Sequence, residues 1–577
     1  MKITKEKNVQ IVISLMKAHG IKRVVASPGS MNYTFLLSIQ DDPDFEIYSC
    51  TDERSAAYMA CGMVSEDGKP VALSCTLATA SRDYMPGLTE AYYRKLPILA
   101  ITSTSSEQNA GQLIGQQLDR TARPKDLVVE SVYLPSTYCR KDELVCEREA
   151  NKAMLALFQN GGGPVHIELG CNTMDSFTDE PLPQARVIRR YTHNDVLPEM
   201  PEGRIAVMLG VHAKMEQKLV DAIDAFCATH DAIVLCVNPK SYNGKYAANA
   251  GLLFSQPGYS GQLNKMDVCI QIGEIFTDAI GFRTNPKEAW RVNEDGVVRD
   301  HESKLTKIFQ MTEYEFFRFY SKEGANHTEQ IELFRREDAE IRKLIPELPF
   351  SNAWIAQRIA PVIPVDSEMY LGILNSLRMF DYANPSSQLH TNANTGGFGI
   401  DGCISSMIGA SIVAPHKEFY GVFGDLAFFY DMNSLGNRHI GKNLHIMLMN
   451  NDGGQQFRNF DHPAHTMGEA ADLFIAAAGH NSPKSRNLVK HYAEDLGFAY
   501  VSASNKEEFE KVLPEYLATG RSIVCEIFID GKDDGDAVKK LRSIYTTDRN
   551  IKQAAKNFVV NQLGTERIEA IKKIIGR

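Results

Sequence analysis

The chain alternates between short apolar runs and longer amphipathic segments, with polar turn residues between them. Short apolar runs bounded by turn residues are typical of strands buried on both faces of a parallel sheet. In the first third of the chain we expect such strands at 24–26, 45–48, 71–75, 98–101 and 165–168. Helical periodicity predicts helices at 5–19, from about 32, from 51, at 79–93 and at 143–158. This alternation predicts a doubly wound α/β sheet.

Proline-rich and polar stretches divide the chain at 180–201 and again after a charged helical segment at 329–344. The alternation of strands and helices resumes after each of them. We therefore predict an α/β protein with three doubly wound parallel-sheet domains, the last ending in a charged helical tail. The predicted domains are residues 1–180, 195–345 and 350–577.

The middle domain is expected to contain strands at 205–210, 233–237 and 268–272 and a helix at 213–229. Its predicted strand ends carry no polar cluster comparable to those of the other two domains. The sequence therefore indicates no ligand for this domain.

The segment 418–455 has the pattern of a β-α-β unit whose strands end in polar residues. We expect strands at 419–423 and 444–449, joined by a crossover helix at 426–435. The first strand ends in Gly424-Asp425, and the second ends in a turn of asparagine, aspartate and glycine. Because the carboxyl ends of parallel strands meet at one edge of the sheet, these residues are expected to lie together where ligands bind.

Three oxygen donors occur at these strand ends: the carboxylate of Asp425, the side-chain amide of Asn451 and the backbone carbonyl of Gly453. Hard oxygen ligands of this kind suit Mg²⁺, which completes its coordination with water and bound phosphates. The GD pair, followed by the second asparagine of an NN pair, resembles the diphosphate–magnesium signature of thiamine-diphosphate (ThDP) enzymes. The alternative is an ordinary strand-end turn, because GD and NDGG are common turn sequences.

Composition narrows the function classes. The 577 residues are 44% hydrophobic and 23% charged, and the net charge of −10 is spread without long runs. This balance argues against a nucleic-acid partner or an anionic membrane, and no apolar stretch is long enough to span a bilayer. The N-terminus lacks the pattern of a signal peptide. Eleven cysteines, none in a CxxC pair, indicate reduced core residues and a cytoplasmic enzyme.

A ThDP enzyme needs a second group, which promotes loss of the C2 proton of the cofactor. A carboxyl group that shares a proton with N1′ of the aminopyrimidine ring does this. Glu53 is the candidate, because it follows the strand at 45–48 in the first turn of a helix. The small residues after it allow close packing against another domain or subunit. The alternative is ordinary charge placement at a helix N-terminus, where acidic residues are favoured.

Together these patterns resemble the ThDP-dependent 2-oxo-acid decarboxylase and carboligase superfamily, over nearly the whole chain. Within it, the chain is most similar to the menaquinone-pathway carboligases that make succinyl-enolpyruvyl-hydroxycyclohexene-carboxylate (SEPHCHC synthases) from isochorismate and 2-oxoglutarate. The segments that carry the resemblance are SPGS at 27–30, DER at 52–54, GPVHIELG at 163–170, NSL at 375–377, GIDG at 399–402, GDL at 424–426, YDMN at 430–433 and NNDGGQ at 450–455.

The resemblance implies a pyrimidine-binding domain, a central domain and a diphosphate-binding domain. It assigns cofactor activation to Glu53, magnesium to Asp425, Asn451 and the Gly453 carbonyl, and backbone contacts with the diphosphate to Gly424 and Leu426. Three further assignments follow from it. Ser376 contacts the cofactor, Ile400 is the apolar wedge between its two rings, and Gln112 lies near the reacting centre. For Ile400 and Gln112 the alternatives are a core isoleucine and an exposed loop glutamine.

Several arginines of the menaquinone-pathway carboligases are missing. Those enzymes bind carboxylates with arginine, whereas this chain has Met31 after SPGS, Thr102–Ser105 in place of a DRP motif, and Phe380 at a third position. The loop before GIDG is also uncharged. We therefore expect other substrates. The candidate substrate residues are Ser30, Arg82, Arg378, Arg458 and His462.

The leading hypothesis is a ThDP- and magnesium-dependent enzyme that decarboxylates a 2-oxo acid and passes the acyl anion to an acceptor or a proton. One alternative is an authentic SEPHCHC synthase whose carboxylate clamp is rebuilt from other arginines. Another is a non-catalytic ThDP-fold scaffold. Because Glu53 and the metal site lie on different domains, the resemblance implies a homodimer or homotetramer with the active site at the subunit interface.

Overall fold

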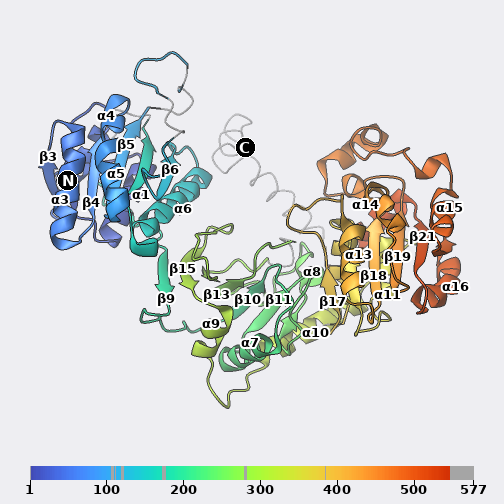
Figure 1. Cartoon of the computed structure of the whole chain (residues 1–577). Coiled ribbons are helices and arrows are strands. Elements are labelled where there is room, and N and C mark those ends of the chain that lie inside the picture. The colour runs from blue at the N-terminus through green and yellow to red at the C-terminus, as the bar shows by residue number, and fades with distance from the viewer. Residues whose placement is uncertain are drawn as a thin grey trace, which may run out of the picture. The chain divides into compact units, whose positions relative to one another are not determined.

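The computed structural model describes residues 2–105, 110, 112–118, 123–171, 177–277, 283–383, 385–386 and 388–545. The chain forms two compact units. The first comprises Met1–Leu197 with Glu294–Gln310, and the second comprises Pro198–Asn293 with Met311–Arg577. Figure 1 shows helices and strands following one another along the coloured chain.

The first unit is built on a six-stranded parallel sheet with the strand order β3-β2-β4-β5-β7-β6. Its strands are β2 (Arg23–Ala26), β3 (Glu46–Ser49), β4 (Val71–Cys75), β5 (Ile98–Thr104), β6 (Glu130–Leu134) and β7 (Val165–Gly170). Its helices are α1 (Lys7–Ala18), α2 (Tyr33–Ile39), α3 (Glu53–Asp67), α4 (Thr79–Asp83), α5 (Met85–Arg94) and α6 (Arg140–Ala156). The short strands β1 (Ile3–Thr4) and β8 (Phe177–Thr178) pair antiparallel, and β9 (Arg189–Thr192) pairs parallel with β15 (Leu305–Gln310).

Helices cover both faces of this sheet. One core joins α1 and α6 to the strands, with Val12 and Met154 fully buried, and the other joins α3 and α5, with Ala57 and Leu88 buried. The contact between α3 and α5 is close, since a Cβ at Gly87 would lie 2.4 Å from the Ala57 Cβ. The predicted doubly wound α/β sheet is confirmed, and the tight packing of α3 sets the position of the helix that begins at Glu53.

One local prediction in this unit is wrong, and one strand was not predicted. The continuous helix expected at 79–93 is divided at Tyr84 into α4 and α5, because Pro86 in the first turn of α5 has no N–H for a helical hydrogen bond. Strand β6 was not expected. It is a half-buried edge strand whose short alternating pattern is a weak signal.

The second unit contains two parallel sheets. The central sheet has the order β12-β11-β10-β13-β14, and the sheet that follows in the chain has the order β17-β16-β18-β19-β21-β20. The central elements are β10 (Ile205–Leu209), α7 (Gln217–His230), β11 (Ile233–Cys236), β12 (Ala247–Ala248), α8 (Gly251–Phe254), β13 (Val268–Ile272), β14 (Glu288–Val292), α9 (Glu313–Tyr320) and α10 (Glu329–Lys343).

The last sheet carries the predicted β-α-β unit. Its strands are β16 (Glu368–Leu371), β17 (His390–Asn392), β18 (Phe419–Gly424), β19 (Leu444–Asn450), β20 (Ala499–Ala503) and β21 (Ile523–Phe528). Its helices are α11 (Asn352–Ile359), α12 (Asn375–Ala383), α13 (Cys403–Val413), α14 (Asp425–Asp431), α15 (Leu488–Asp495), α16 (Lys506–Leu517) and α17 (Gly531–Leu541). Of the predicted charged tail, the structure describes α17 and the residues up to 545.

The expectation that the central strands end without a polar cluster is wrong. Asn238 and Lys240, which follow β11, are both buried. The backbone N–H and side-chain amide of Asn238 donate to Asp381 Oδ1 at 2.6 and 2.8 Å, and the backbone N–H of Lys240 donates to Thr391 Oγ1 at 2.8 Å. A polar cluster therefore joins the central sheet to the sheet that follows it.

All eleven cysteines are free, as expected, and most are buried. Among the helices of the described residues, none is both long and apolar enough to cross a bilayer.

Candidate functional site

The ends of β18 and β19 lie side by side. The two strands pair in parallel from Phe419↔Leu444 to Gly424↔Met449. Asp425 and Asn450 therefore follow at one edge of the sheet, and the turn 451–454 comes directly after. This is the arrangement that the sequence predicted.

Asp425 is held against the second strand end by backbone hydrogen bonds. Its Oδ2 accepts from the Gly453 N–H at 2.8 Å and its Oδ1 accepts from the Leu426 N–H at 2.7 Å. Only 4% of the residue is exposed. Burial raises the pKa of Asp425 to about 6, although the two N–H groups oppose this shift. A cation beside the carboxylate would offset the cost of burying its charge.

The amide of Asn451 is oriented by a buried carboxylate. Its Nδ2 donates to Asp534 Oδ2 at 3.2 Å, and Asp534 Oδ1 in turn accepts from the Asn352 N–H at 2.8 Å. A carboxylate that accepts from Nδ2 leaves Oδ1 of Asn451 as the group that can bind a cation. Complete burial raises the pKa of Asp534 to about 6.

The turn that follows Asn451 requires glycine at position 453. Gly453 has φ +138°, and a Cβ there would lie 2.7 Å from the Ala476 carbonyl oxygen. The preceding residue, Asp452, is also left-handed, with φ +56°. The Gly454 N–H donates to the same Ala476 carbonyl at 2.6 Å. The backbone of this turn thus approaches its neighbours closely, which requires a residue without a Cβ at position 453.

These donors fit magnesium with a diphosphate better than a metal held by protein alone. One carboxylate, one amide oxygen and one backbone carbonyl are hard ligands, but they are too few for a six-coordinate ion. No group of three or more His, Cys, Asp or Glu residues suited to a metal occurs within the described parts of the chain. The remaining ligands would have to come from water and a bound phosphate.

Arg458 contacts the turn 451–454 from the following 3₁₀ helix (Gln455–Arg458). Its Nη1 donates to the Asn451 carbonyl at 2.8 Å and its Nη2 to the Asp452 carbonyl at 3.2 Å, while Nε donates to Asp472 Oδ1 at 2.9 Å. The guanidinium group therefore braces the turn. A cavity of about 750 Å³ borders this region and is lined by Asn451, Arg458, His465, Lys532 and Lys539 among others.

The other predicted residues of this unit lie on nearby segments. Ser376 is buried in the first turn of α12, and Arg378 on the same helix donates to Gln456 Oε1 at 3.0 Å. His462 accepts from the Ala464 N–H at 3.1 Å, which caps a 3₁₀ helix. Ile400 is only half-buried in the loop before α13, so it is not an ordinary core isoleucine.

Glu53 opens α3 in the first unit. Asp52 caps the helix, and its side chain accepts from the Ser55 N–H at 2.8 Å. Glu53 is half-buried and lies near the fully buried Tyr84. Burial raises the pKa of Tyr84 well above its usual value, and the negative charge of Glu53 adds to the shift. The helix start thus presents Glu53 beside a buried phenol.

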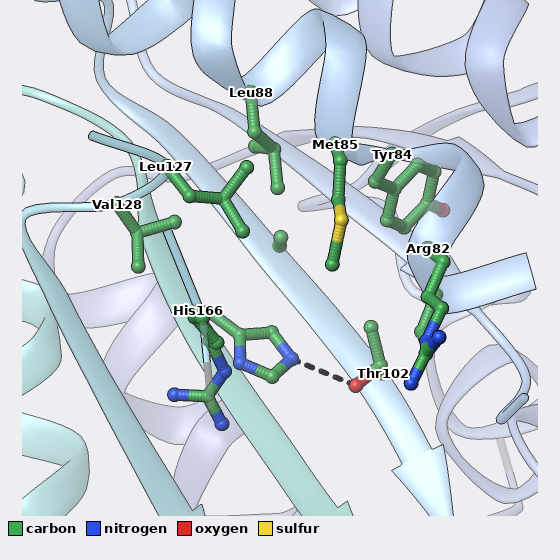
Figure 2. Close-up of a pocket in the computed structure, with 11 residues that line it drawn as sticks. Arg82, Tyr84, Met85, Leu88, Thr102, Leu127, Val128 and His166 are labelled. Atoms are coloured by element: carbon green, nitrogen blue, oxygen red, sulfur yellow. Dashed lines mark hydrogen bonds between the residues drawn. The ribbon is translucent and has the colours of Figure 1, made fainter. Parts of the chain in front are cut away.

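A cavity of about 190 Å³ adjoins Tyr84, and Arg82 lines it (Figure 2). His166 on β7 forms its floor, with Nε2 2.8 Å from Thr102 Oγ1 and Nδ1 2.9 Å from Ser131 Oγ. Figure 2 shows Met85, Leu88 and Leu127 on the opposite side of the cavity. The lining is mixed, because Arg82, Arg123, Thr102 and His166 face these apolar side chains. Apolar contacts combined with arginines suit a small organic anion.

The last two predicted residues of this unit are exposed. Ser30 lies in the turn after β2, and Gln112 lies in the short described stretch 112–118. Glu53, Ser30, Arg82 and Gln112 belong to the first unit, whereas the oxygen donors that follow β18 and β19 belong to the second.

Two site residues were missed. Asp534 was taken as part of a charged tail, but it is buried and holds Asn451. Asp472, the partner of Arg458, stands among alanines and larger apolar residues, with no pattern that distinguishes it. The acidic residues at the start of α17, directly after a buried strand, were the available signal for Asp534.

Two family models match the chain. Residues 7–122 match the thiamine pyrophosphate enzyme N-terminal TPP-binding domain, and residues 374–527 match the thiamine pyrophosphate enzyme C-terminal TPP-binding domain. The first match includes Glu53 and the second includes Asp425, Asn451 and Gly453.

Curated relatives align over almost the full chain. The 2-succinyl-5-enolpyruvyl-6-hydroxy-3-cyclohexene-1-carboxylate synthase of Bacteroides fragilis is 30% identical over 563 residues, which is 92% of this chain and 98% of the relative. The synthases of the same name from Bacteroides thetaiotaomicron and Flavobacterium psychrophilum are 29% and 25% identical, over 92% and 91% of this chain and 98% and 96% of theirs. The chain therefore belongs to the thiamine-diphosphate-dependent enzyme family, close to the SEPHCHC synthases.

Proposed function

We propose that this enzyme uses ThDP and Mg²⁺ to decarboxylate a 2-oxo acid and transfer the resulting acyl anion to an acceptor or to a proton. The observation that carries the proposal is the donor set at the ends of β18 and β19, where a buried Asp425 lies against the Gly453 turn. A buried carboxylate beside an oriented amide oxygen and a backbone carbonyl supplies the hard oxygen ligands that a magnesium–diphosphate pair requires.

In this proposal Asp425, the Asn451 Oδ1 atom and the Gly453 carbonyl hold Mg²⁺. Gly424 and Leu426 contact the diphosphate with their backbone, and a Cβ at Gly424 would have nothing within 4 Å, so there is room beside it. Ser376 and Ile400 contact the remainder of the cofactor. Residues 1–180 form the pyrimidine-binding domain, 195–345 the central domain and 350–577 the diphosphate-binding domain.

ThDP, when bound, supplies the carbanion that adds to the 2-oxo carbonyl and takes up the electron pair released with CO₂. Glu53 holds a proton at N1′ of the aminopyrimidine ring, which promotes removal of the C2 proton. Gln112 is assigned to the reacting centre.

We also propose that the enzyme is a homodimer or homotetramer in which Glu53 of one subunit serves the metal site of another. The support is the family resemblance together with the position of Glu53 and Asp425 on separate domains. The free cysteines support a cytoplasmic location.

The substrates are proposed to be a small 2-oxo acid and a polar acceptor. Arg82 is the best-supported substrate residue, because it lines a cavity that combines apolar and polar side chains. Ser30, Arg378, Arg458 and His462 remain candidates, although Arg458 and His462 already form hydrogen bonds within the turn region.

A panel of 2-oxo acids tests the proposal. The purified protein with ThDP and Mg²⁺ is assayed for CO₂ release, with and without aldehyde acceptors. We expect one or a few acids to release CO₂, and acceptor-dependent product if the enzyme is a carboligase. Failure of every acid, together with failure to retain ThDP, would favour the non-catalytic scaffold.

A second candidate function is SEPHCHC synthesis. The full-length similarity to proteins of that name favours it, whereas the missing arginines at the positions of Met31 and Phe380 oppose it. Consumption of isochorismate together with 2-oxoglutarate distinguishes the two functions directly.

A further inference from the structure

The central sheet borders a cavity that the proposed reaction does not use. Its volume is about 420 Å³, and it lies at the carboxyl ends of β11 and β12, where Cys236 and Asn249 stand. Helix α10 contributes Arg335 and Asp338 to its wall, and the segment before β17 contributes Ser386. It shares no lining residue with the cavity beside the turn 451–454.

Lys240 brings a buried positive charge to this cavity. Only 4% of the residue is exposed. Its Nζ donates to the Pro385 carbonyl at 2.8 Å. An ammonium group has three N–H donors, and one carbonyl compensates little of the cost of removing its charge from water. Burial accordingly lowers the pKa of Lys240.

The lining is positively charged overall. Lys245 and Arg335 line the cavity with Lys240, and the Arg335 Nη2 donates to the Lys245 carbonyl at 2.7 Å, which holds the two together. Asp338 is the one carboxylate among the described lining residues, and it is paired with Arg342, whose Nε lies 2.7 Å from its Oδ2. Three cations therefore face a single carboxylate that is already neutralised.

Two buried polar atoms in the lining have no partner among the described residues. They are Nδ2 of Asn249 and Oδ1 of Asp338. Oδ1 of Asn249 accepts from the Gly251 N–H at 3.1 Å, which determines the orientation of its amide. One atom is thus a donor that needs an acceptor, and the other is an acceptor that needs a donor. A ligand hydroxyl group can satisfy both needs.

We propose that this cavity binds a polar metabolite that carries a phosphate monoester, of the size and hydroxylation of a sugar phosphate. A phosphate monoester carries about −1.5 to −2 charges at pH 7, which balances Lys240, Lys245 and Arg335. Its hydroxyl groups pair with Asn249 and Asp338. The site is separate from the β10–β13 junction, where the strand order reverses and doubly wound sheets usually bind nucleotides.

Isothermal titration calorimetry on the full chain tests this inference. The protein is first saturated with ThDP and Mg²⁺, so that a diphosphate site does not compete. Glucose 6-phosphate is the probe, and glucose and inorganic phosphate are titrated separately. We expect glucose 6-phosphate to bind at least about ten times more tightly than either, because each alone makes only part of the contacts.

Two variants and a matched control locate the binding. Arg335→Gln and Lys240→Met should each weaken glucose 6-phosphate binding about tenfold or more, since each removes a charge-assisted hydrogen bond. Arg336→Gln makes the same change at the next position of α10, which is exposed and does not line the cavity, and it should leave the affinity unchanged. Because Arg335 is also exposed, its variant is expected to fold even if Lys240→Met does not.

Three results would overturn the inference. They are absence of binding, equal affinity for inorganic phosphate and glucose 6-phosphate, and an Arg335→Gln variant that binds as tightly as Arg336→Gln. None of these measurements depends on turnover, so the inference and the proposed reaction can fail independently.

Discussion

Arg458 has two candidate roles, binding the substrate and supporting the turn 451–454, and removing its side chain distinguishes them. The sequence placed it among the substrate residues, whereas in the structure its guanidinium group bonds the carbonyls of Asn451 and Asp452 and the carboxylate of Asp472. The side chain is 22% exposed, so solvent screens these bonds only in part. We predict that Arg458→Ala weakens cofactor binding by loosening the turn 451–454, which is part of the proposed magnesium site.

The size of the effect follows from the two bonds to the turn. Hydrogen bonds to a charged group contribute about 1.5–3 kcal/mol each, and partial exposure favours the lower value. Loss of both therefore costs about 3 kcal/mol, which corresponds to roughly a 100-fold higher ThDP concentration for half-reconstitution at fixed Mg²⁺. Arg458→Lys should need a ThDP concentration between those of wild type and Arg458→Ala, because a single ammonium group cannot bond both carbonyls and Asp472.

The assay strips the cofactor with a chelator, adds back ThDP at fixed Mg²⁺, and follows reconstitution by protein fluorescence and by CO₂ release. Arg521→Ala, which removes an exposed arginine paired with Glu515, is the control and should behave as wild type. An Arg458→Ala variant with an unchanged reconstitution midpoint but a raised KM for the 2-oxo acid would refute the bracing role and restore the substrate role.

Three further predictions concern the turn, the substrate cavity and pH. Gly453→Ala should abolish cofactor retention, because its Cβ would meet the Ala476 carbonyl at 2.7 Å and φ is +138°; retention of bound ThDP after gel filtration would contradict this. Arg82→Gln should raise the KM for the carboxylate substrate about tenfold with little change in kcat. Steady-state kinetics with a lowered kcat and an unchanged KM would exclude Arg82 from substrate binding. Burial would raise the pKa of Glu368, but hydrogen bonds from His390 and Lys417 lower it to about 2 from 4.5. Glu368 therefore adds stability above pH 4.5 that is lost as the pH falls through 2. Glu368→Gln should lower the free energy of unfolding by about 2 kcal/mol at pH 7, after allowance for solvent screening, and by almost nothing near pH 2. Urea unfolding at both pH values measures this, and an equal loss at both would contradict it.

The sequence predicted most of the sheets because apolar strands buried on both faces leave an unmistakable pattern. Strand β4 was predicted with its observed bounds, and β18 and β19 within a residue. The donors Asp425 and Asn451 follow those strands directly, so strand periodicity was enough to bring them to one edge. The break at Tyr84 was missed although Pro86 stands in the sequence, because the apolar pattern continues across it.

Contacts between distant segments could not be predicted in this way. Arg458 bonds backbone carbonyls whose directions depend on the left-handed residues Asp452 and Gly453. Asp534 is buried against Asn451 only because α17 packs beside the strand end. Lys240 and Asp338 meet at one cavity from separate elements, and nothing local in either segment indicates the other. Side chains that act through long-range partners leave no periodic signal.

The measurement that most directly tests the central claim is exchange of the C2 proton of bound ThDP with deuterium, followed by NMR after quenching. It needs no knowledge of the substrate. With Mg²⁺ and saturating cofactor, wild type should exchange the proton much faster than free ThDP does. Glu53→Gln should slow the exchange by about 100-fold or more, the usual contribution of a positioned proton-transfer group, while ThDP affinity stays nearly unchanged. Exchange at the wild-type rate in Glu53→Gln would contradict the assignment of Glu53 and with it the proposed site.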